Sequence, residues 1–362
     1  MKTRVSVLTE FNRPLVTEER EIPPLREGEI LVRITASGVC GSDVHMWKGT
    51  DPRTPLPLVP GHEGVGTVEE IAGNRTDIHG TPLKPGDYVI WDRGYTCGRC
   101  YFCTVRKEPF LCPHRRVYGI VRDGCYATHL VLTAATNVVR VDSDIDPSVL
   151  VPVSCSGATT AHTMELCPVH TGDTVVIQGP GPMGMFALAF AAQAGAANLL
   201  VLGTGADGKR LELAPEFGAT HTLVIDDSPP ERQVEYVRDI THGRGADAVI
   251  DCTGSPRAVN AGLSMTAPGG TYTLPGIAVP AGEIPIRFYE DVARKNVRIQ
   301  GVWVSDTRHL YRALNLVLSR KFPFEKLVTH RFPLEKATEA LKTVEGRSAM
   351  KAVLLPRGDT DD

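Results

Sequence analysis

Apolar positions follow two different patterns along the chain, and the change falls near residue 155. Before it, short strand-like runs lie at residues 30–34, 65–68 and 88–90, and turn sequences such as residues 84–87 separate them. Short apolar and β-branched runs bounded by glycine and proline are typical of β-strands. The first part of the chain is therefore predicted to be rich in β-structure.

After residue 155, strand-like runs alternate with helical stretches. The runs lie at residues 175–177, 199–202, 223–225, 248–250 and 271–274. An apolar helix is expected to begin at Met183 and another near Arg210, and Pro215 should kink or shorten the second because proline lacks an N–H donor. This alternation predicts βαβ units and a parallel sheet with helices on both faces.

The C-terminal part contains helical patterns at residues 310–318 and 334–344 and a strand-like run at 352–354. We expect this part to return to the first domain. The predicted organisation is an α/β protein of two domains, one formed by residues 1–155 with 301–362 and the other by residues 156–300.

Composition places the chain among ordinary globular proteins. Its net charge of −3, from 39 basic and 42 acidic side chains in 362 residues, leaves no electrostatic footprint for nucleic acid or an anionic membrane. The first residues lack the apolar stretch of a signal peptide, and no run of eighteen apolar residues occurs. We expect a cytoplasmic protein with neither a nucleic-acid nor a membrane partner.

Four cysteines form a closely spaced set, the cysteine ladder: Cys97, Cys100, Cys103 and Cys112. Two-residue gaps let thiolates converge on one ion, and four thiolates in a tetrahedron suit zinc and leave no position open. The ladder therefore predicts a structural zinc site. A chance cluster or two disulfides are the alternatives, but such spacing in a cytosolic chain is more typical of metal binding.

A glycine motif predicts a dinucleotide site. Residues 179–184, which include Pro182 and Met183 as candidate cofactor-binding residues, fit G-x-G-x-x-G directly after a predicted strand and open the predicted helix. Gly179 would permit the tight turn, Gly181 would let the backbone approach a pyrophosphate, and Gly184 would let helix and sheet pack closely. A glycine-rich turn without a ligand is the alternative.

The end of the second strand of this domain bears on the choice of cofactor. NAD sites usually have an acidic residue there for the ribose 2′-hydroxyl, but this chain has Gly203 followed by Thr204. With Lys209 and Arg210, Thr204 could supply donors to a 2′-phosphate, which favours NADP. Asp207 could instead reach a ribose hydroxyl, and the two basic residues could be only a solvated helix start.

A second set of possible metal ligands is spread along the chain. Cys40 and His62 lie in the first part, and Cys155 lies at the change of pattern. Two thiolates and an imidazole form a three-ligand set that leaves one tetrahedral position for water or substrate, as in catalytic zinc sites. Each residue alone could be an ordinary buried side chain, but beside a nucleotide motif the set predicts a catalytic zinc.

Together these motifs resemble those of the zinc-containing medium-chain dehydrogenase/reductase family, the alcohol and polyol dehydrogenases. The resemblance covers essentially the whole chain and includes residues 40–45, residues 61–66, the cysteine ladder, Cys155 with Thr159, and residues 179–184. Residues 40–45 and 303–306 are most similar to a bacterial branch of zinc alcohol dehydrogenases. The resemblance implies a GroES-like catalytic domain and a Rossmann domain, with the active site in the cleft between them, in a homodimer or homotetramer built through the Rossmann sheets.

The resemblance assigns roles to matching positions around the catalytic zinc. Cys40, His62 and Cys155 would bind the ion. Glu63 would lie beside it and exchange with water, and Asp43 would orient the histidine ligand.

Other family roles concern the proton and the cofactor. Ser42 would hydrogen-bond the substrate oxygen, His45 would pass the proton to solvent through the cofactor ribose, and Lys351 would lie near the pyrophosphate unless it is an ordinary surface lysine. Two departures from the family pattern are the last gap of the cysteine ladder, eight residues instead of seven, and Gly203 at the usual acidic position.

The predicted function is hydride transfer between a secondary, polar alcohol and NAD(P)+, with two zinc ions per chain and a ketone or aldehyde as product. Arg93, four residues before the cysteine ladder, and Asp51 with Arg53 favour a polar substrate such as a polyol, cyclitol, sugar or small anion. A structural ion pair is the alternative for Arg93.

Two rival functions remain at this point. A non-enzymatic zinc-ribbon interaction protein would account for the cysteine ladder but not for the glycine motif. A zinc-free quinone or alkene reductase of the same superfamily would lack both zinc sets.

Overall fold

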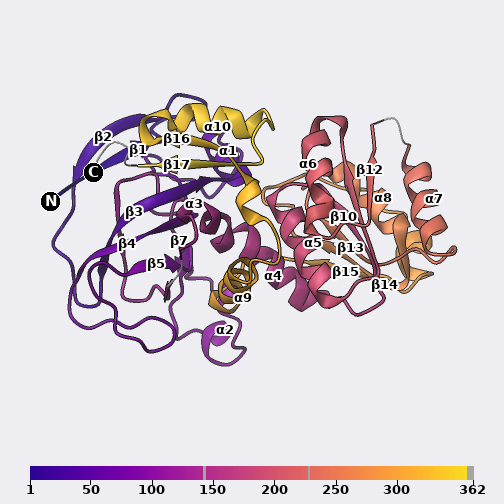
Figure 1. The fold of residues 1–362 in the computed structure, drawn as a ribbon, viewed down its shortest axis with the longest axis horizontal. Helices are drawn as coiled ribbons and strands as arrows, with labels where there is room; N and C mark the ends of the chain where they lie inside the picture. The colour runs from indigo at the N-terminus through magenta and orange to yellow at the C-terminus, as the bar shows by residue number, and fades with distance from the viewer. Residues whose placement is uncertain (142–143, 227–228, 357–362) are drawn as a thin grey trace. The chain divides into compact units, whose positions relative to one another are not determined.

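The computed structural model describes residues 1–141, 144–226 and 229–356. The chain forms two compact units (Figure 1). Unit 1 comprises Met1–Cys155, Ser305–Leu318 and Phe324–Asp362, and unit 2 comprises Ser156–Val304 and Ser319–Pro323. Unit 1 is therefore assembled from segments on both sides of unit 2 in the sequence.

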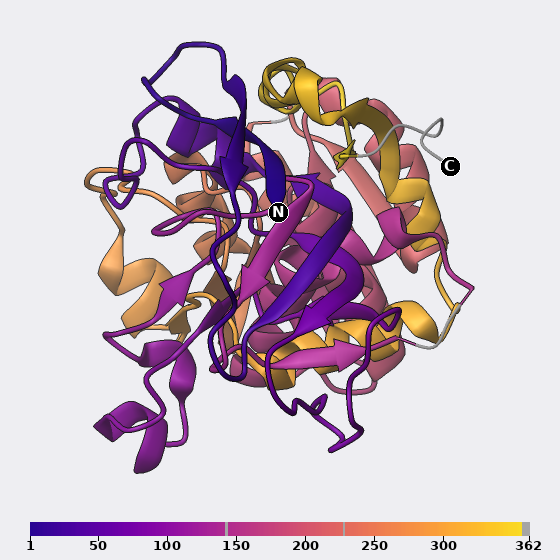
Figure 2. The same ribbon diagram turned by 90° about the vertical axis from the view of Figure 1, so that its left-hand side faces the viewer.

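Unit 1 is built on a seven-stranded sheet, and Figure 2 shows its strands, mostly indigo to magenta. Its order is β16 (Val328–Pro333), β17 (Lys351–Leu355), β3 (Ile30–Val39), β4 (Gly64–Ile71), β5 (Tyr88–Trp91) and β9 (Val138–Arg140), and β8 (His129–Leu132) also pairs with β3. Except for the parallel pair β16–β17, the strands pair antiparallel. Short connections and antiparallel pairing explain why strand-like runs dominate this part of the sequence.

Smaller elements complete unit 1. Two further antiparallel pairs are β1 (Lys2–Val7) with β2 (Val16–Glu21) and β6 (Gly94–Tyr95) with β7 (Arg116–Val117). The helices are α1 (Gly41–Trp47), α2 (Tyr101–Thr104), α3 (Pro147–Leu150), α9 (Thr307–Leu318) and α10 (Ala337–Glu345), and the 3₁₀ turns are η1 (Pro109–Leu111), η2 (Val151–Ser154), η6 (Phe324–Leu327) and η7 (Leu334–Lys336). Helix α10 packs on α1 and on β17, where Leu341 and Leu354 share one apolar cluster.

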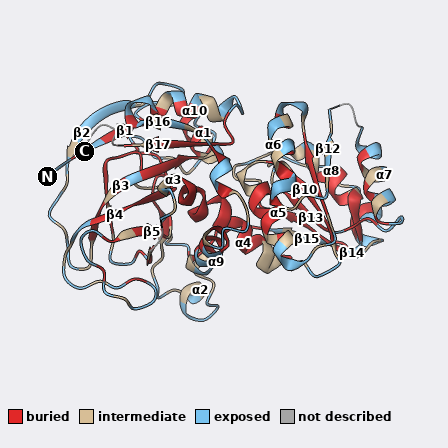
Figure 3. Cartoon of the chain, in the orientation of Figure 1, coloured by how far each residue is buried: buried red, intermediate tan, exposed pale blue. Residues whose placement is uncertain are grey.

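Unit 2 contains a six-stranded parallel sheet with the order β12-β11-β10-β13-β14-β15. The strands are β10 (Thr174–Gln178), β11 (Asn198–Gly203), β12 (His221–Val224), β13 (Ala246–Asp251), β14 (Thr266–Leu274) and β15 (Arg298–Gly301). In sequence terms this order is 3-2-1-4-5-6, the arrangement of a Rossmann fold. Central strands such as β10 are buried throughout (Figure 3), which explains their continuous apolar runs.

Helices connect these strands. They are α4 (Ser156–Leu166), α5 (Pro182–Ala194), α6 (Gly208–Leu213), α7 (Pro230–Ile240) and α8 (Pro256–Met265), with the short turns η3 (Gly205–Asp207), η4 (Ala214–Phe217) and η5 (Phe288–Ala293). The prediction that Pro215 would shorten its helix is confirmed, because α6 ends at Leu213 and continues as the 3₁₀ turn η4. In the part of the chain that the structure describes, no helix has the length and apolar character needed to cross a membrane.

Candidate active site

Four side chains of unit 1 bring metal-ligating atoms within 4.8 Å of one another: Cys40, His62, Glu63 and Cys155. Cys40 is the N-cap residue of α1, His62 and Glu63 directly precede β4, and Cys155 directly follows η2. A hydrogen bond with Cys155 and the nearby His62 hold the pKa of Cys40 well below its ordinary value, although burial opposes this. Two sulfur atoms and an imidazole nitrogen are donors that zinc prefers, so this set fits the predicted ion.

Asp43 fixes the orientation of His62. Its Oδ1 lies 3.1 Å from His62 Nδ1, and its Oδ2 accepts hydrogen bonds from the backbone N–H of Cys40 at 2.7 Å and from the hydroxyl of Tyr126 at 3.3 Å. Burial alone would lower the pKa of His62, but Asp43 raises it to about 10. Because Asp43 holds Nδ1, the other ring nitrogen, Nε2, is turned toward the cluster and available to an ion.

Ser42 and His45 lie three residues apart on α1, so they share one face of this helix. Ser42 Oγ lies 3.3 Å from His62 Nε2, which places a hydroxyl beside the predicted metal position. His45 is half-buried, and its Nδ1 lies 3.2 Å from Thr50 Oγ1. The arrangement puts one hydroxyl at the cluster and one imidazole near solvent.

Glu63 forms an ion pair with Lys351 that motif reasoning did not suggest. Both side chains are almost completely buried, and the Lys351 ammonium contacts Glu63 Oε2. Burial would lower the pKa of Lys351, but Glu63 raises it above its ordinary value. Lys351 is thus buried beside the cluster in unit 1, and its predicted contact with a cofactor pyrophosphate stays a prediction.

Arg93 also reaches the cluster. It lies between β5 and β6, is 6% exposed, and its Nη1 donates a hydrogen bond to Cys155 Sγ at 2.9 Å. Asp51 and Arg53, the other polar residues expected near the substrate, form a two-pronged ion pair with distances of 2.9 and 2.6 Å. Their charges therefore compensate each other, whereas the Arg93 guanidinium lies directly against a predicted metal ligand.

The cysteine ladder brings its four thiols together in unit 1. The sulfur atom of Cys100 lies 3.5 Å from that of Cys103 and 3.7 Å from that of Cys112, and Cys112 lies 3.6 Å from Cys97. A tetrahedron with Zn–S bonds of about 2.3 Å has edges of about 3.8 Å, so this spacing fits one zinc ion. All nine cysteines are unbonded, which argues against the disulfide alternative.

The predicted nucleotide loop opens α5 in unit 2. Gly179 has φ = 96°, a conformation that favours glycine, and Gly181 is the N-cap residue of α5, whose first two residues are Pro182 and Met183. A Cβ on Gly184 would lie 2.1 Å from the carbonyl oxygen of Gly179. A Cβ on Gly181 would meet nothing within 4 Å, so the backbone at the start of α5 is open to the close approach of a phosphate group.

The end of β11 is crowded around position 203. A Cβ on Gly203 would lie 3.0 Å from Pro180 Cγ and 3.2 Å from both Asp207 Cβ and Leu211 Cδ1. Nearby, Thr204 Oγ1 donates to Asp207 at 2.7 Å. The acidic residue expected of an NAD site is thus replaced by a tightly packed glycine.

The basic residues at this corner differ in their surroundings. Arg210 pairs with Asp207 at 3.1 Å, whereas Lys209 is exposed. Asp226, which motif reasoning missed, accepts a hydrogen bond from the backbone N–H of Gly205. An acidic residue just after the predicted strand at 223–225 was the signal that could have found it.

Comparisons with known proteins agree with this geometry. The model of the alcohol dehydrogenase GroES-like domain matches residues 26–143, and that of the zinc-binding dehydrogenase domain matches residues 182–319. A 5-exo-hydroxycamphor dehydrogenase of Pseudomonas putida is 33% identical over 361 residues, which cover 97% of this chain and 98% of the relative. An L-threonine 3-dehydrogenase of Bacillus subtilis (strain 168) is 30% identical over 345 residues, which cover 94% and 95%.

A solved structure agrees as well. The crystal structure of an alcohol dehydrogenase from Thermotoga maritima superposes with a TM-score of 0.94 at 44% sequence identity, covering 99% of this chain and 100% of that chain. Matches to both domain models and to relatives along nearly their whole length leave no place for the zinc-ribbon alternative. The chain therefore belongs to the zinc-containing medium-chain dehydrogenase/reductase family and is an NAD(P)-dependent alcohol dehydrogenase.

Proposed function

We propose that this dehydrogenase oxidises a polar secondary alcohol at a zinc ion held by Cys40, His62 and Cys155. The observation that carries the proposal is the convergence of these three buried donors beside the Ser42 hydroxyl. A three-ligand set leaves a position open for the substrate oxygen, and zinc bound there would supply the Lewis acidity that alcohol oxidation requires. The cysteine ladder would hold a second, structural zinc.

The side chains around this position have distinct tasks. The Ser42 hydroxyl would accept a hydrogen bond from the substrate hydroxyl and take up its proton while it passes its own hydroxyl proton on toward His45. His45, one turn along α1 and half-exposed, would carry that proton toward solvent. Asp43 keeps His62 in the ligating orientation throughout. NAD(P)+ would accept the hydride, so a ketone is the product of a secondary alcohol.

A polar substrate is supported by the charge beside the cluster. The Arg93 guanidinium is buried next to Cys155, and a purely hydrocarbon pocket would not accommodate such a group well. The names of the two relatives refer to hydroxycamphor and threonine, both of which carry a secondary hydroxyl group. We therefore place secondary alcohols with additional polar groups ahead of short aliphatic alcohols.

NADP is the cofactor that the β11 corner supports best. Gly203 puts no acidic side chain at the position that usually binds the ribose 2′-hydroxyl, and Lys209 is exposed nearby. The Gly205 N–H already donates to an anionic oxygen, that of Asp226, so this backbone group is suited to a phosphate oxygen. Asp226 would compete with the 2′-phosphate for that donor.

The cofactor proposal is tested by kcat/KM measured with both cofactors. We expect NADP to be preferred, Asp226→Asn to increase the preference, and Lys209→Ala to decrease it by about tenfold, the loss expected for about 1.4 kcal/mol of phosphate contact. A tenfold preference of the unmodified enzyme for NAD would overturn the proposal.

The substrate proposal is tested by a panel of secondary alcohols with and without hydroxyl, carboxylate or phosphate groups. Polar members should show the highest kcat/KM. If short aliphatic alcohols were the best substrates, the polar-site interpretation would fail. Metal analysis of the same preparation should find two zinc ions per chain, whereas a zinc-free reductase would contain none.

We further propose a homodimer or homotetramer in the cytoplasm. Strand β15 is an edge strand of the unit 2 sheet, and three of its four residues are exposed, so a second copy could extend the sheet there. The nine unbonded cysteines fit a reducing compartment. Light scattering on the purified protein tests the assembly, and a monomer would contradict it.

A further inference from the structure

Arg93 is placed to influence the metal centre through one of its ligands. Its Nη1 donates a hydrogen bond to Cys155 Sγ at 2.9 Å, and both side chains are buried. We propose that Arg93 is a positioning residue that draws electron density from the Cys155 sulfur and thereby increases the Lewis acidity left to the bound ion. This inference rests on the proposed zinc site and extends it.

The backbone around Arg93 is fixed on both sides. The carbonyl oxygen of Arg93 accepts a hydrogen bond from Tyr118 N at 2.9 Å, and the N–H of Asp92 donates to the carbonyl oxygen of Asn137 at 3.0 Å. Gly94 then pairs with Val117 in the β6–β7 ladder. A side chain that starts from such a constrained backbone reaches its partner with little loss of conformational entropy.

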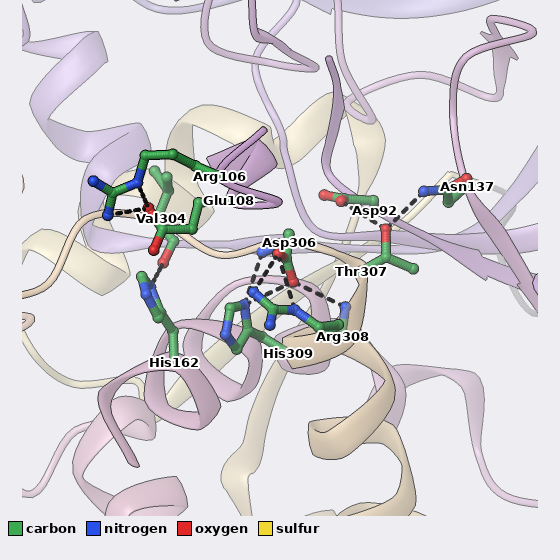
Figure 4. Close-up of polar contacts among 10 residues, drawn as sticks. All are labelled: Asp92, Arg106, Glu108, Asn137, His162, Val304, Asp306, Thr307, Arg308 and His309. Atoms are coloured by element: carbon green, nitrogen blue, oxygen red, sulfur yellow. Dashed lines mark hydrogen bonds and ion pairs between the residues drawn. The ribbon is translucent and has the colours of Figure 1, made fainter. Parts of the chain in front are cut away.

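Neighbouring charges have their own partners. Asp92 accepts a hydrogen bond from Arg115 Nη2 at 3.3 Å. It also accepts one from Thr307 Oγ1 at 3.2 Å, and Asn137 in turn donates to Thr307 at 2.8 Å (Figure 4). The Arg115 side chain is also largely buried, at 8% exposed, but it contacts the carboxylate. Two buried guanidinium groups thus lie near each other, and one of them donates directly to a predicted metal ligand.

Such a hydrogen bond draws electron density from the sulfur toward the guanidinium. A guanidinium remains charged at all physiological pH values, and a charge-assisted hydrogen bond in a buried site is stronger than one in water. It stabilises the sulfur lone pairs, which therefore donate less to the ion. Groups that hydrogen-bond to metal ligands tune metal sites, and their removal typically changes affinity or activity about 10- to 100-fold.

Cobalt substitution reports this effect without relying on turnover. In Co(II)-loaded protein, sulfur-to-cobalt charge-transfer absorption moves to longer wavelength when the sulfur lone pairs rise in energy. The contribution of the cysteine ladder is removed by subtracting the spectrum of a Cys40→Ser/His62→Ala variant. We expect Arg93→Leu and Arg93→Gln to shift the remaining band to longer wavelength, and Arg93→Lys, which keeps a charged donor, to restore part of the shift.

Kinetics should follow the spectra. For Arg93→Leu we expect kcat to fall about 10- to 100-fold near neutral pH, with the midpoint of the kcat–pH profile moved upward. Arg115→Lys is the matched control, since it alters a largely buried guanidinium that contacts Asp92, and it should leave the band in place.

The outcomes separate this inference from the proposed zinc site. If the difference spectrum of the unmodified protein contained no thiolate band, the zinc assignment itself would fail. If that band were present and all three Arg93 variants left it unmoved, the inference would be overturned. An unmoved band with a raised KM would instead assign Arg93 to direct substrate binding.

Discussion

Replacing Lys351 with methionine should sharply destabilise unit 1. The ammonium of Lys351 and the carboxylate of Glu63 are 2% and 0% exposed, so the substitution leaves a carboxylate buried without its cation. Removing one partner of a buried ion pair typically costs about 3–5 kcal/mol. With a urea dependence of about 2–3 kcal/mol per molar, the unfolding midpoint should fall by about 1–2.5 M.

Tryptophan fluorescence can follow the unfolding of unit 1. Of the three tryptophans, Trp47 and Trp91 are buried in unit 1, whereas Trp303 is 47% exposed in unit 2. Urea titrations of zinc-loaded protein, followed at the wavelength of the buried indoles, therefore measure mainly unit 1. Lys336→Met is the matched control, because the Lys336–Glu339 pair is exposed and should contribute less than about 1 kcal/mol.

A second variant separates charge from packing. In Glu63→Gln/Lys351→Met both charges are absent, so no unpaired charge remains and at least half of the lost stability should return. A loss below about 1 kcal/mol for Lys351→Met alone would show that the reasoning is wrong. So would a double variant no more stable than the single one.

Three further predictions concern the metal sites and the Asp51–Arg53 ion pair. Cys40→Ser should reduce the zinc content from two ions to one and nearly abolish turnover while the fold persists; near wild-type rates would refute the ligand assignment. Cys100→Ser should release the other ion and lower stability or disturb assembly, with a smaller effect on turnover, measured by metal analysis and limited proteolysis. Burial raises the pKa of Asp51, but hydrogen bonds from Arg53 lower it below its ordinary value. The stabilisation from the ionised Asp51 side chain is therefore present above the unfolded-state pKa near 4 and is lost as the pH falls through the lower pKa of the folded state. Asp51→Asn should therefore cost about 1–2 kcal/mol at pH 7 and less at pH 3 in urea titrations; an equal cost at both pH values would contradict this account.

The hydrophobic pattern predicted those elements whose side chains are buried throughout or buried at alternate positions. The buried parallel strands of unit 2 are continuous apolar runs, and β10, β11 and β13 were found on that basis. Helix α4 was not predicted from the sequence, because Ser156 to Thr163 are all buried and no apolar stripe distinguishes one face of the helix. Strand β2 was not predicted either, because five of its six residues are exposed and four are charged, so it lacks buried apolar positions that would mark it as a strand.

In the candidate site, sequence motifs reveal the metal ligands but not the contacts that depend on the fold. Ligand types identified Cys40, His62 and Cys155 although they are far apart in the sequence, because zinc chemistry restricts the donors. The contacts of Arg93 with Cys155 and of Lys351 with Glu63 join residues 62 and 288 positions apart. Such pairs depend on how strands β3, β4, β5 and β17 are arranged, which no local pattern encodes.

The place of Lys351 in the chain makes the metal centre a late product of synthesis. Translation proceeds from the N-terminus, so Cys40, Glu63 and Cys155 emerge long before the lysine on β17. All of unit 2 is made in the interval, and its parallel sheet can form while Glu63 still lacks its cation. A chain whose synthesis stopped before β17 would thus contain every proposed zinc ligand and still leave the centre without its balancing charge.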